Sequence, residues 1–174
     1  MAETYSFIVN GKSVETAENK SLLRFLRDDL GLHSVKDGCS QGACGTCTVI
    51  VDGKTTRGCV LTTAKAAGKS ILTVEGLSLR EKEAFVYAFG VKGSVQCGFC
   101  IPGMVISGKA LLDQNPNPKE DEIRLALRGN ICRCTGYTKI VEGIQLVAAI
   151  LRGEASIDEK FEMEGAFGVG DKAF

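Results

Sequence analysis

The sequence of 174 residues contains no tryptophan and only one histidine, and aromatic residues make up 6% of it. Lys plus Arg and Asp plus Glu both number 21, so neither sign of charge is in excess. Nucleic-acid binding calls for a basic face or stacking aromatic side chains, and the composition supplies neither. No apolar run approaches the ~20 residues that a membrane-spanning helix requires. We therefore expect neither nucleic acid nor a membrane as a partner.

The N-terminal residues alternate polar and apolar side chains and lack the basic stretch or twin arginine of an export signal. This predicts a cytoplasmic location, where glutathione and thioredoxin keep thiols reduced. The sequence nevertheless contains eight cysteines. In a reducing compartment they are more typical of metal ligands than of four disulfide bonds, which are the less favoured alternative.

Short strands and one helix are predicted for the first half of the chain. Residues 4–9 and 12–16 have a strand pattern around Asn10-Gly11, a strong signal for a hairpin turn. Residues 21–30 have the apolar spacing of an amphipathic helix. Three further strands are expected at Thr48–Val51, Lys54–Arg57 and Ile71–Val74. This order predicts a small mixed sheet that grasps one helix.

The pattern becomes helical after Gly76. Ser78 and Glu81 have the spacing of a capping box. We expect four helices in a compact bundle, beginning near Ser78, Pro102, Glu120 and Thr138. Charged and glycine-punctuated residues follow the last helix. These changes divide the chain into three predicted parts: a first domain over residues 1–76, a second over 77–153, and an extended tail over 154–174.

Four cysteines of the first half have the spacing of plant-type ligands to a [2Fe–2S] cluster: Cys39, Cys44, Cys47 and Cys59. Three of these thiolates stand on one tight loop that can wrap a compact cofactor, and the fourth closes this first site from a hairpin. The loop also contains glycines that permit positive φ and let backbone N–H groups approach the sulfurs: Gly38, Gly42 and Gly45. Zinc is the alternative metal, but zinc sites usually combine two short C-x2-C knuckles, which this loop lacks.

The second site consists of Cys97 and Cys100 in one segment and Cys132 and Cys134 in another. Neither pair can enclose a metal alone, so the two segments are expected to meet. Four cysteines would, by number alone, also fit a zinc site. Iron is favoured because the first site already indicates an electron carrier, and because a C-x-C pair holds two sulfurs close together for a two-iron cluster. A thioredoxin-type dithiol at Cys97 and Cys100 is less favoured, since that motif needs a βαβ context.

Other residues receive structural interpretations. His33 has no partner visible in the sequence and is expected at the surface or at a helix cap rather than as a general base. Met104 is expected in the core because the thiolates suffice as ligands. Three phenylalanines are assigned to the core rather than to electron relay: Phe85, Phe89 and Phe99. The chain thus shows no catalytic residue of its own.

Three motifs carry a resemblance to a known family: residues 38–47 (GCSQGACGTC), 96–103 (QCGFCIPG) and 132–137 (CRCTGY). Residues 3–155 resemble the iron–sulfur subunit or domain of the molybdenum hydroxylases, which include xanthine oxidase, xanthine dehydrogenase and aldehyde oxidoreductase. The resemblance implies an α+β fold, with an N-terminal β-grasp, ferredoxin-like domain and a C-terminal four-helix domain. It also implies one [2Fe–2S] cluster in each domain.

The resemblance further implies what the two sites face. The second site would lie beside molybdopterin in a large subunit or domain, where Gln96 and Cys134 match positions that touch the pterin. The first site would face an FAD-binding medium subunit or domain. Single electrons would pass from the molybdopterin centre through both clusters to FAD or another acceptor. The chain would thus be the iron–sulfur component of an oxidoreductase without catalysis of its own.

Two other functions are less favoured. A free-standing two-cluster ferredoxin commonly presents a strongly charged docking face, which a net charge of zero does not favour. A zinc-stabilised interaction module agrees with the cysteine count, and its lack of visible absorption would distinguish it. Residues 165–174 resemble the entry to the molybdenum-binding part of fused relatives. We expect the tail to be extended and packed on a large partner rather than on its own bundle.

Overall fold

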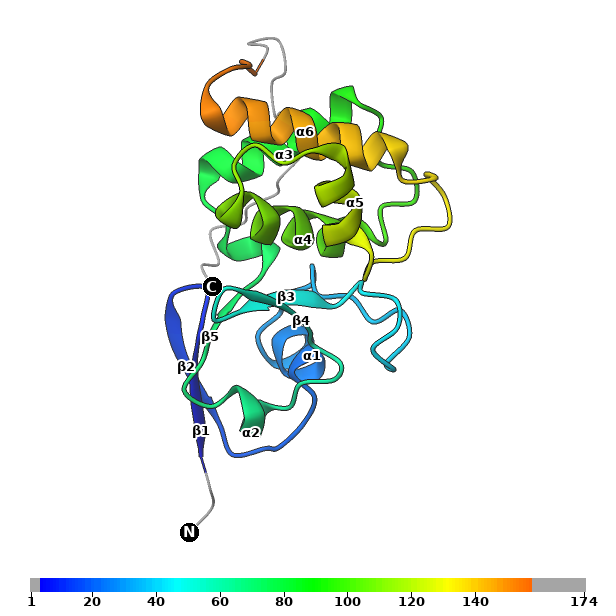
Figure 1. The fold of residues 1–174 in the computed structure, drawn as a ribbon. Coiled ribbons are helices and arrows are strands. Elements are labelled where there is room, and N and C mark those ends of the chain that lie inside the picture. The colour runs from blue at the N-terminus through cyan, green and yellow to red at the C-terminus, as the bar shows by residue number, and fades with distance from the viewer. Residues whose placement is uncertain (1–3, 158–174) are drawn as a thin grey trace.

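A five-stranded sheet forms the N-terminal half of the protein in the computed structural model, which describes residues 4–157. Its strands are β1 (Tyr5–Val9), β2 (Lys12–Thr16), β3 (Thr48–Val51), β4 (Lys54–Arg57) and β5 (Ser70–Leu72). They lie in the order β2-β1-β5-β3-β4, with β1 parallel to β5 and the other neighbouring pairs antiparallel. The predicted mixed sheet is therefore confirmed (Figure 1).

Both hairpins of the sheet turn at an Asn-Gly or Asp-Gly pair. Asn10 and Gly11 have φ values of 51° and 80°, and Asp52 and Gly53 have values of 47° and 80°. Two consecutive positive φ values characterise the type I′ turn, whose twist matches that of the flanking strands. These turns set the pairing of β1 with β2 and of β3 with β4.

The helix grasped by the sheet starts at Ser21, whose hydroxyl accepts a hydrogen bond from the Arg24 N–H at 3.3 Å. One α-helical turn, α1 (Leu22–Arg24), continues as the π-helical segment η1 (Phe25–Asp29). The apolar pattern over residues 21–30 predicts the position of this helix but not its change to π-helical winding.

A short segment connects the last strand of the sheet, β5, to the helical half. Strand β5 occupies residues 70–72 instead of the predicted 71–74, because Asn10 binds the backbone and side chain of Thr73. Asn10 Oδ1 accepts the Thr73 N–H at 2.9 Å, and Asn10 Nδ2 donates to Thr73 Oγ1 at 3.0 Å. The sequence patterns also miss two elements that are too short for a periodic signal: α2 (Thr63–Ala66) and the 3-10 turn η2 (Val74–Gly76).

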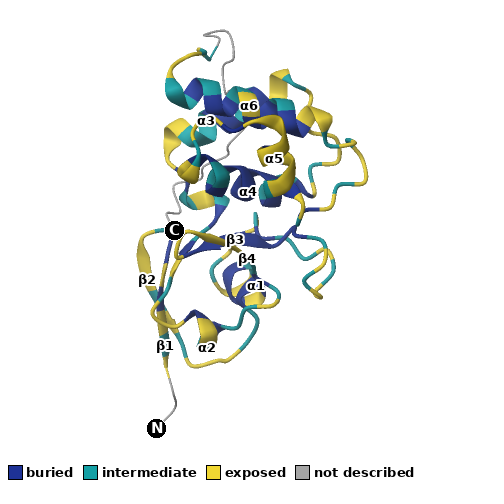
Figure 2. Cartoon of the chain, in the orientation of Figure 1, coloured by how far each residue is buried: buried dark blue, intermediate teal, exposed yellow. Residues whose placement is uncertain are grey.

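Helices make up the C-terminal half of the described chain: α3 (Leu79–Val91), α4 (Ile101–Gln114), α5 (Glu120–Leu127) and α6 (Thr138–Arg152). The capping box expected before α3 is present. Ser78 Oγ accepts the Glu81 N–H at 3.3 Å, and Glu81 Oε2 accepts the Ser78 N–H at 2.8 Å. Buried side chains from these helices form one core (Figure 2). The α+β architecture of a sheet half followed by a helical half is thus confirmed.

Strand β3 joins the two halves because helices cover both of its faces. All of its residues are buried. Ile50 packs against Ile106 and Ala110 of α4, whereas Val49 and Val51 belong to the core around α1 and η1. Figures 1 and 2 show β3 between these two layers. A strand buried on both faces calls for a nearly continuous apolar run, which residues 48–51 provide.

The chain leaves α6 at Gly153. Ala155 and Ile157 pack against the helical core, so the expectation that the tail does not pack on its own bundle is wrong for these first residues. The rest of the predicted tail, from residue 158 onward, lies outside the described residues. Within residues 4–157, no helix has both the length and the apolar character needed to cross a bilayer.

Candidate metal centres

The loop of the first site spans residues 38–47 and leads into β3. Gly42 and Gly45 both have a φ of 74°, as expected for glycines that turn a tight loop. Gly38 does not adopt positive φ. A Cβ at this residue would lie 3.0 Å from Cys44 Sγ, so close packing explains the glycine there.

Backbone N–H groups of this loop point at cysteine sulfurs. Cys39 Sγ accepts hydrogen bonds from the N–H groups of Gln41 and Cys44, each at 3.4 Å. Cys59 Sγ accepts one from the Gly42 N–H at 3.2 Å, which ties the fourth cysteine to the loop. Such donors compensate the negative charge of thiolates. They provide the surroundings that an anionic cluster requires.

The thiols of the first site have contrasting environments. Backbone hydrogen bonds from Cys44, Gln41 and Ala43 lower the pKa of the Cys39 thiol to about 6. Burial raises the pKa of the Cys47 thiol to about 12. Cys39 therefore forms a thiolate readily at neutral pH, whereas Cys47 needs a neighbouring cation to hold the charged form in the interior. Bound iron fits this requirement.

The four cysteines of the second site line one cavity of about 220 Å³. They come from the loop between α3 and α4 and from the loop between α5 and α6. The sulfurs of Cys97 and Cys134 lie 3.6 Å apart and both residues are exposed, whereas Cys100 is buried at the start of α4. The two segments meet as expected, and Cys97 and Cys134 form the exposed side of the site.

Tyr137 and Thr135 hold the second of these loops in place. The Tyr137 hydroxyl accepts from the Cys132 N–H at 2.9 Å and donates to Asn130 O at 3.3 Å. Thr135 Oγ1 lies 3.1 Å from Cys132 Sγ. Tyr137 has a φ of 71°, a strained conformation for a residue with a side chain. Sequence reasoning assigned no role to Tyr137 or Asn130, although Thr-Gly-Tyr directly follows the C-x-C pair.

The thiols of the second site also differ from one another. Burial raises the pKa of the Cys100 thiol to about 12. On the exposed side, the Phe99 N–H lowers the pKa of the Cys97 thiol, and the hydrogen-bonded Cys97 thiol raises that of Cys134. Like the first site, this site combines a buried thiol with one that is stabilised as a thiolate.

Within residues 4–157, no group of three or more His, Cys, Asp or Glu residues is arranged to hold a single metal ion. A [2Fe–2S] cluster differs from a single ion because its ligands are divided between two irons. The cavity shared by the second set of cysteines, the N–H donors at the sulfurs and the buried thiols all fit such a cluster.

Gln96 is exposed and directly precedes the exposed Cys97. Because the sulfurs of Cys97 and Cys134 are neighbours, Gln96 and Cys134 belong to one surface region. The structure thus places both residues expected to face a pterin on the open side of the second site. Their contact with a pterin stays a prediction.

The remaining interpretations hold with one exception. His33 is exposed, and Met104 is completely buried in the helical core. Phe85 and Phe89 also belong to that core. The core assignment of Phe99 is wrong, since this residue is 46% exposed. It lies in the loop between two cysteines, not on the inward face of a helix.

Two family models match the chain, and they meet at residue 73. The model described as a 2Fe-2S iron-sulfur cluster binding domain matches residues 7–73. The model described as a [2Fe-2S] binding domain matches residues 73–145. Each matched range contains one of the two sets of four cysteines.

Relatives match across most of the chain. The nicotinate dehydrogenase small FeS subunit of Eubacterium barkeri is 47% identical over 140 residues, 79% of this chain and 89% of that protein. The structure of quinoline 2-oxidoreductase from Pseudomonas putida matches with a TM-score of 0.79 and 42% identity, over 88% of this chain and 98% of that chain. An aldehyde oxidoreductase structure from Desulfovibrio desulfuricans matches with a TM-score of 0.84 and 42% identity, over 90% of this chain and 18% of that chain. The chain therefore belongs to the family of small iron–sulfur subunits of the molybdenum hydroxylases and contains two [2Fe–2S]-binding domains.

Proposed function

We propose that this protein is the electron-transfer subunit of a molybdenum-dependent hydroxylase or dehydrogenase. As an iron–sulfur component, it is part of an oxidoreductase complex. Its partners are a molybdopterin-binding large subunit and an FAD-binding medium subunit, or domains equivalent to them. Electrons enter at the second site and leave from the first site toward FAD or another acceptor. This proposal is supported above all by the position of the second site. It is exposed at Cys97 and Cys134, and its cavity is also lined by Cys44 of the first site.

Each site holds one [2Fe–2S] cluster, and a cluster carries one electron at a time when bound. The proposed ligands are Cys39, Cys44, Cys47 and Cys59 in the first site, and Cys97, Cys100, Cys132 and Cys134 in the second. The protein contributes the positions of the sulfurs and the N–H groups that stabilise their negative charge. The division into residues 1–76, residues 77–153 and a tail from residue 154 belongs to this proposal.

Segments of the two sites touch one another directly. The N–H of Ile131, the residue before Cys132, donates to Cys44 O at 2.8 Å. Lys36 Nζ donates to Gly98 O at 3.1 Å and lies 5.2 Å from the centre of the Phe99 ring. Such contact supports transfer of an electron between the sites without an intervening partner.

The partner-facing residues of the proposal are Gln96 and Cys134. Both lie at the exposed side of the second site, where a pterin-bearing subunit can approach the sulfurs. A cytoplasmic location also belongs to the proposal, because a reducing compartment keeps cysteines available as thiolate ligands instead of disulfides.

Metal and sulfide analysis of the purified complex tests the proposal. Two clusters should give about four iron atoms and four labile sulfides per copy of this chain. Low-temperature EPR of the reduced complex should resolve two rhombic signals, because the two ligand sets have different surroundings. A single signal with half that iron would remove the second site, and zinc in place of iron would refute electron transfer altogether.

A further inference from the structure

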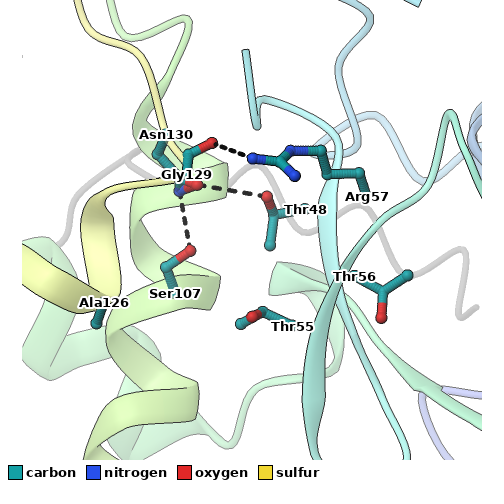
Figure 3. Close-up of a pocket in the computed structure, with 8 residues that line it drawn as sticks. All are labelled: Thr48, Thr55, Thr56, Arg57, Ser107, Ala126, Gly129 and Asn130. Atoms are coloured by element: carbon teal, nitrogen blue, oxygen red, sulfur yellow. Dashed lines mark hydrogen bonds between the residues drawn. The ribbon is translucent and has the colours of Figure 1, made fainter. Parts of the chain in front are cut away.

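Three glycines line the contact between the two cysteine loops. Gly45 belongs to the loop of the first site, Gly103 to α4, and Gly129 to the segment before Cys132. We call this contact the glycine seam. It borders a polar cavity of about 150 Å³, in which the guanidinium group of Arg57 points toward Gly129 (Figure 3).

The missing side chains are what allow the backbones to touch. A Cβ at Gly103 would lie 2.4 Å from Gly45 O, and a Cβ at Gly45 would lie 2.2 Å from Gly129 O. Both distances are far below an ordinary carbon–oxygen contact. Because both obstacles are backbone atoms, no side-chain rotation can relieve the clash. A larger residue at position 45 or 103 must separate the segments.

Hydrogen bonds hold the seam closed. The Ile131 N–H donates to Cys44 O, and Arg57 Nη2 donates to Gly129 O at 3.2 Å. Asn130 is only 5% exposed, and its Nδ2 donates to Ser107 Oγ of α4 at 2.9 Å. Figure 3 shows Arg57 from the end of β4, Ser107 from α4 and Asn130 from the segment after α5 converging at this contact. The segments on either side of the seam are therefore fixed relative to one another.

From this geometry we infer that the glycine seam sets the separation of the two metal centres, and with it the rate of electron transfer between them. The inference rests on the proposed function, because it needs a cluster in each site. Cys44 directly precedes Gly45, and Cys132 lies close after Gly129, so a shift of the seam moves a ligand of each cluster. The three glycines act as positioning residues, because electron tunnelling decays exponentially with distance.

The variant Gly103→Ala tests the inference. Its methyl group must move the Gly45 backbone by about 1 Å to reach the 3.4 Å at which ordinary contact begins. We expect both clusters to be retained, the magnetic interaction between the reduced centres to weaken in EPR, and transfer between them to slow several-fold. Gly108→Ala is the matched control in the same helix, because its methyl meets the end of the Ile144 side chain at 3.1 Å, away from the seam. It should leave the interaction unchanged.

A second variant covers the case in which Gly103→Ala does not fold. Arg57→Ala adds no atom to the seam but removes the hydrogen bond to Gly129 O. It should weaken the magnetic interaction in the same direction and by a smaller factor. An interaction equal to that of the wild type in either folded variant, with iron content preserved, overturns the inference and leaves the proposed function intact. Absence of two clusters in the wild type overturns the proposed function instead.

Discussion

The two sites contain the same number of cysteines but depend on the fold to different degrees. In the first site, three cysteines share one loop, and the fourth is held to that loop by the Gly42 N–H. In the second site, each loop supplies two cysteines, and α4 and α5 separate the loops in sequence. A site built mainly on one loop is encoded by local spacing, whereas the second exists only where the bundle brings its two loops together.

The sites also differ in what anchors them. Backbone N–H groups and two positive-φ glycines shape the first site. The second site also has positive-φ glycines and a backbone N–H at a sulfur, from Thr135 to Cys132 at 3.5 Å, but it adds a side-chain anchor, the Tyr137 hydroxyl, which bridges Cys132 and Asn130. Its sulfurs at Cys97 and Cys134 are exposed. This exposure suits the second site to contact with a partner.

Substitution of one ligand in each site should produce the largest effects. Cys59→Ser should remove the first cluster and leave the second, because the sites lie in different halves. The matched variant Cys100→Ser should remove the second cluster. In each case iron should fall from about four to about two atoms per chain, with loss of one EPR signal. In Cys59→Ser, substrate should still reduce molybdenum while transfer to the terminal acceptor fails.

Cys59→Ser can leave the second cluster in place only if the helical half stays folded when the first cluster is lost. Ile50 of β3 packs against Ile106 and Ala110 of α4, so the halves share part of their core. If Cys59→Ser abolished both EPR signals, the halves would fold only together, and the boundary near Gly76 would not separate independent units.

The comparison also explains how far the sequence predicts the structure. The β1–β2 hairpin turn, the α3 capping box and the first site follow from local patterns, because neighbouring residues determine them. The roles of Tyr137 and Asn130 depend on contacts between segments that meet only after folding. The exposure of Phe99 was missed because an aromatic residue beside a helix start is usually read as core. The glycine seam was missed because a glycine gives no sign of which backbone approaches it.

The next largest effect concerns the exposed side of the second site. Gln96→Ala should slow electron transfer from molybdenum or weaken pterin retention, because it removes a polar side chain beside Cys97 at the proposed interface. Iron content should stay at the wild-type level. Rapid reduction of the clusters by substrate, together with cofactor analysis, measures both effects. Gln145→Ala, at an exposed position of α6, is the control. Equal turnover and cofactor content in both variants would argue against a pterin contact at Gln96.

The smallest effect should come from Glu75, which anchors the segment leading to the first site. Glu75 Oε1 accepts the Ser34 N–H at 2.9 Å, and Oε2 accepts the hydroxyls of Ser34 and Thr73, each at 2.6 Å. Lys82 Nζ donates to the Glu75 backbone oxygen at 2.8 Å. Glu75 is exposed at the surface, but neighbouring atoms still desolvate its carboxyl in part, which opposes ionisation. The hydrogen bonds from Ser34 and Thr73 outweigh this effect and lower the pKa of the Glu75 carboxyl below 4.5.

A carboxyl whose pKa is lower in the folded state than in the unfolded state stabilises the protein at pH values above the unfolded pKa, which is near 4.5 for Glu75. This stabilisation is lost as the pH falls through the pKa of the folded state. Glu75→Gln should therefore destabilise the protein at pH 7 by at most about 1 kcal/mol, because solvent screens an exposed carboxylate. The difference from wild type should shrink in acid, as measured by urea unfolding at a series of pH values. Tyr137→Phe is the comparison variant at the second site, because the hydrogen bonds that it removes involve no carboxylate. The stability that this variant loses should therefore stay the same across the pH series. A Glu75→Gln difference that stays constant down to acid pH would show that the hydrogen-bonded shape of the side chain, and not its charge, anchors the segment.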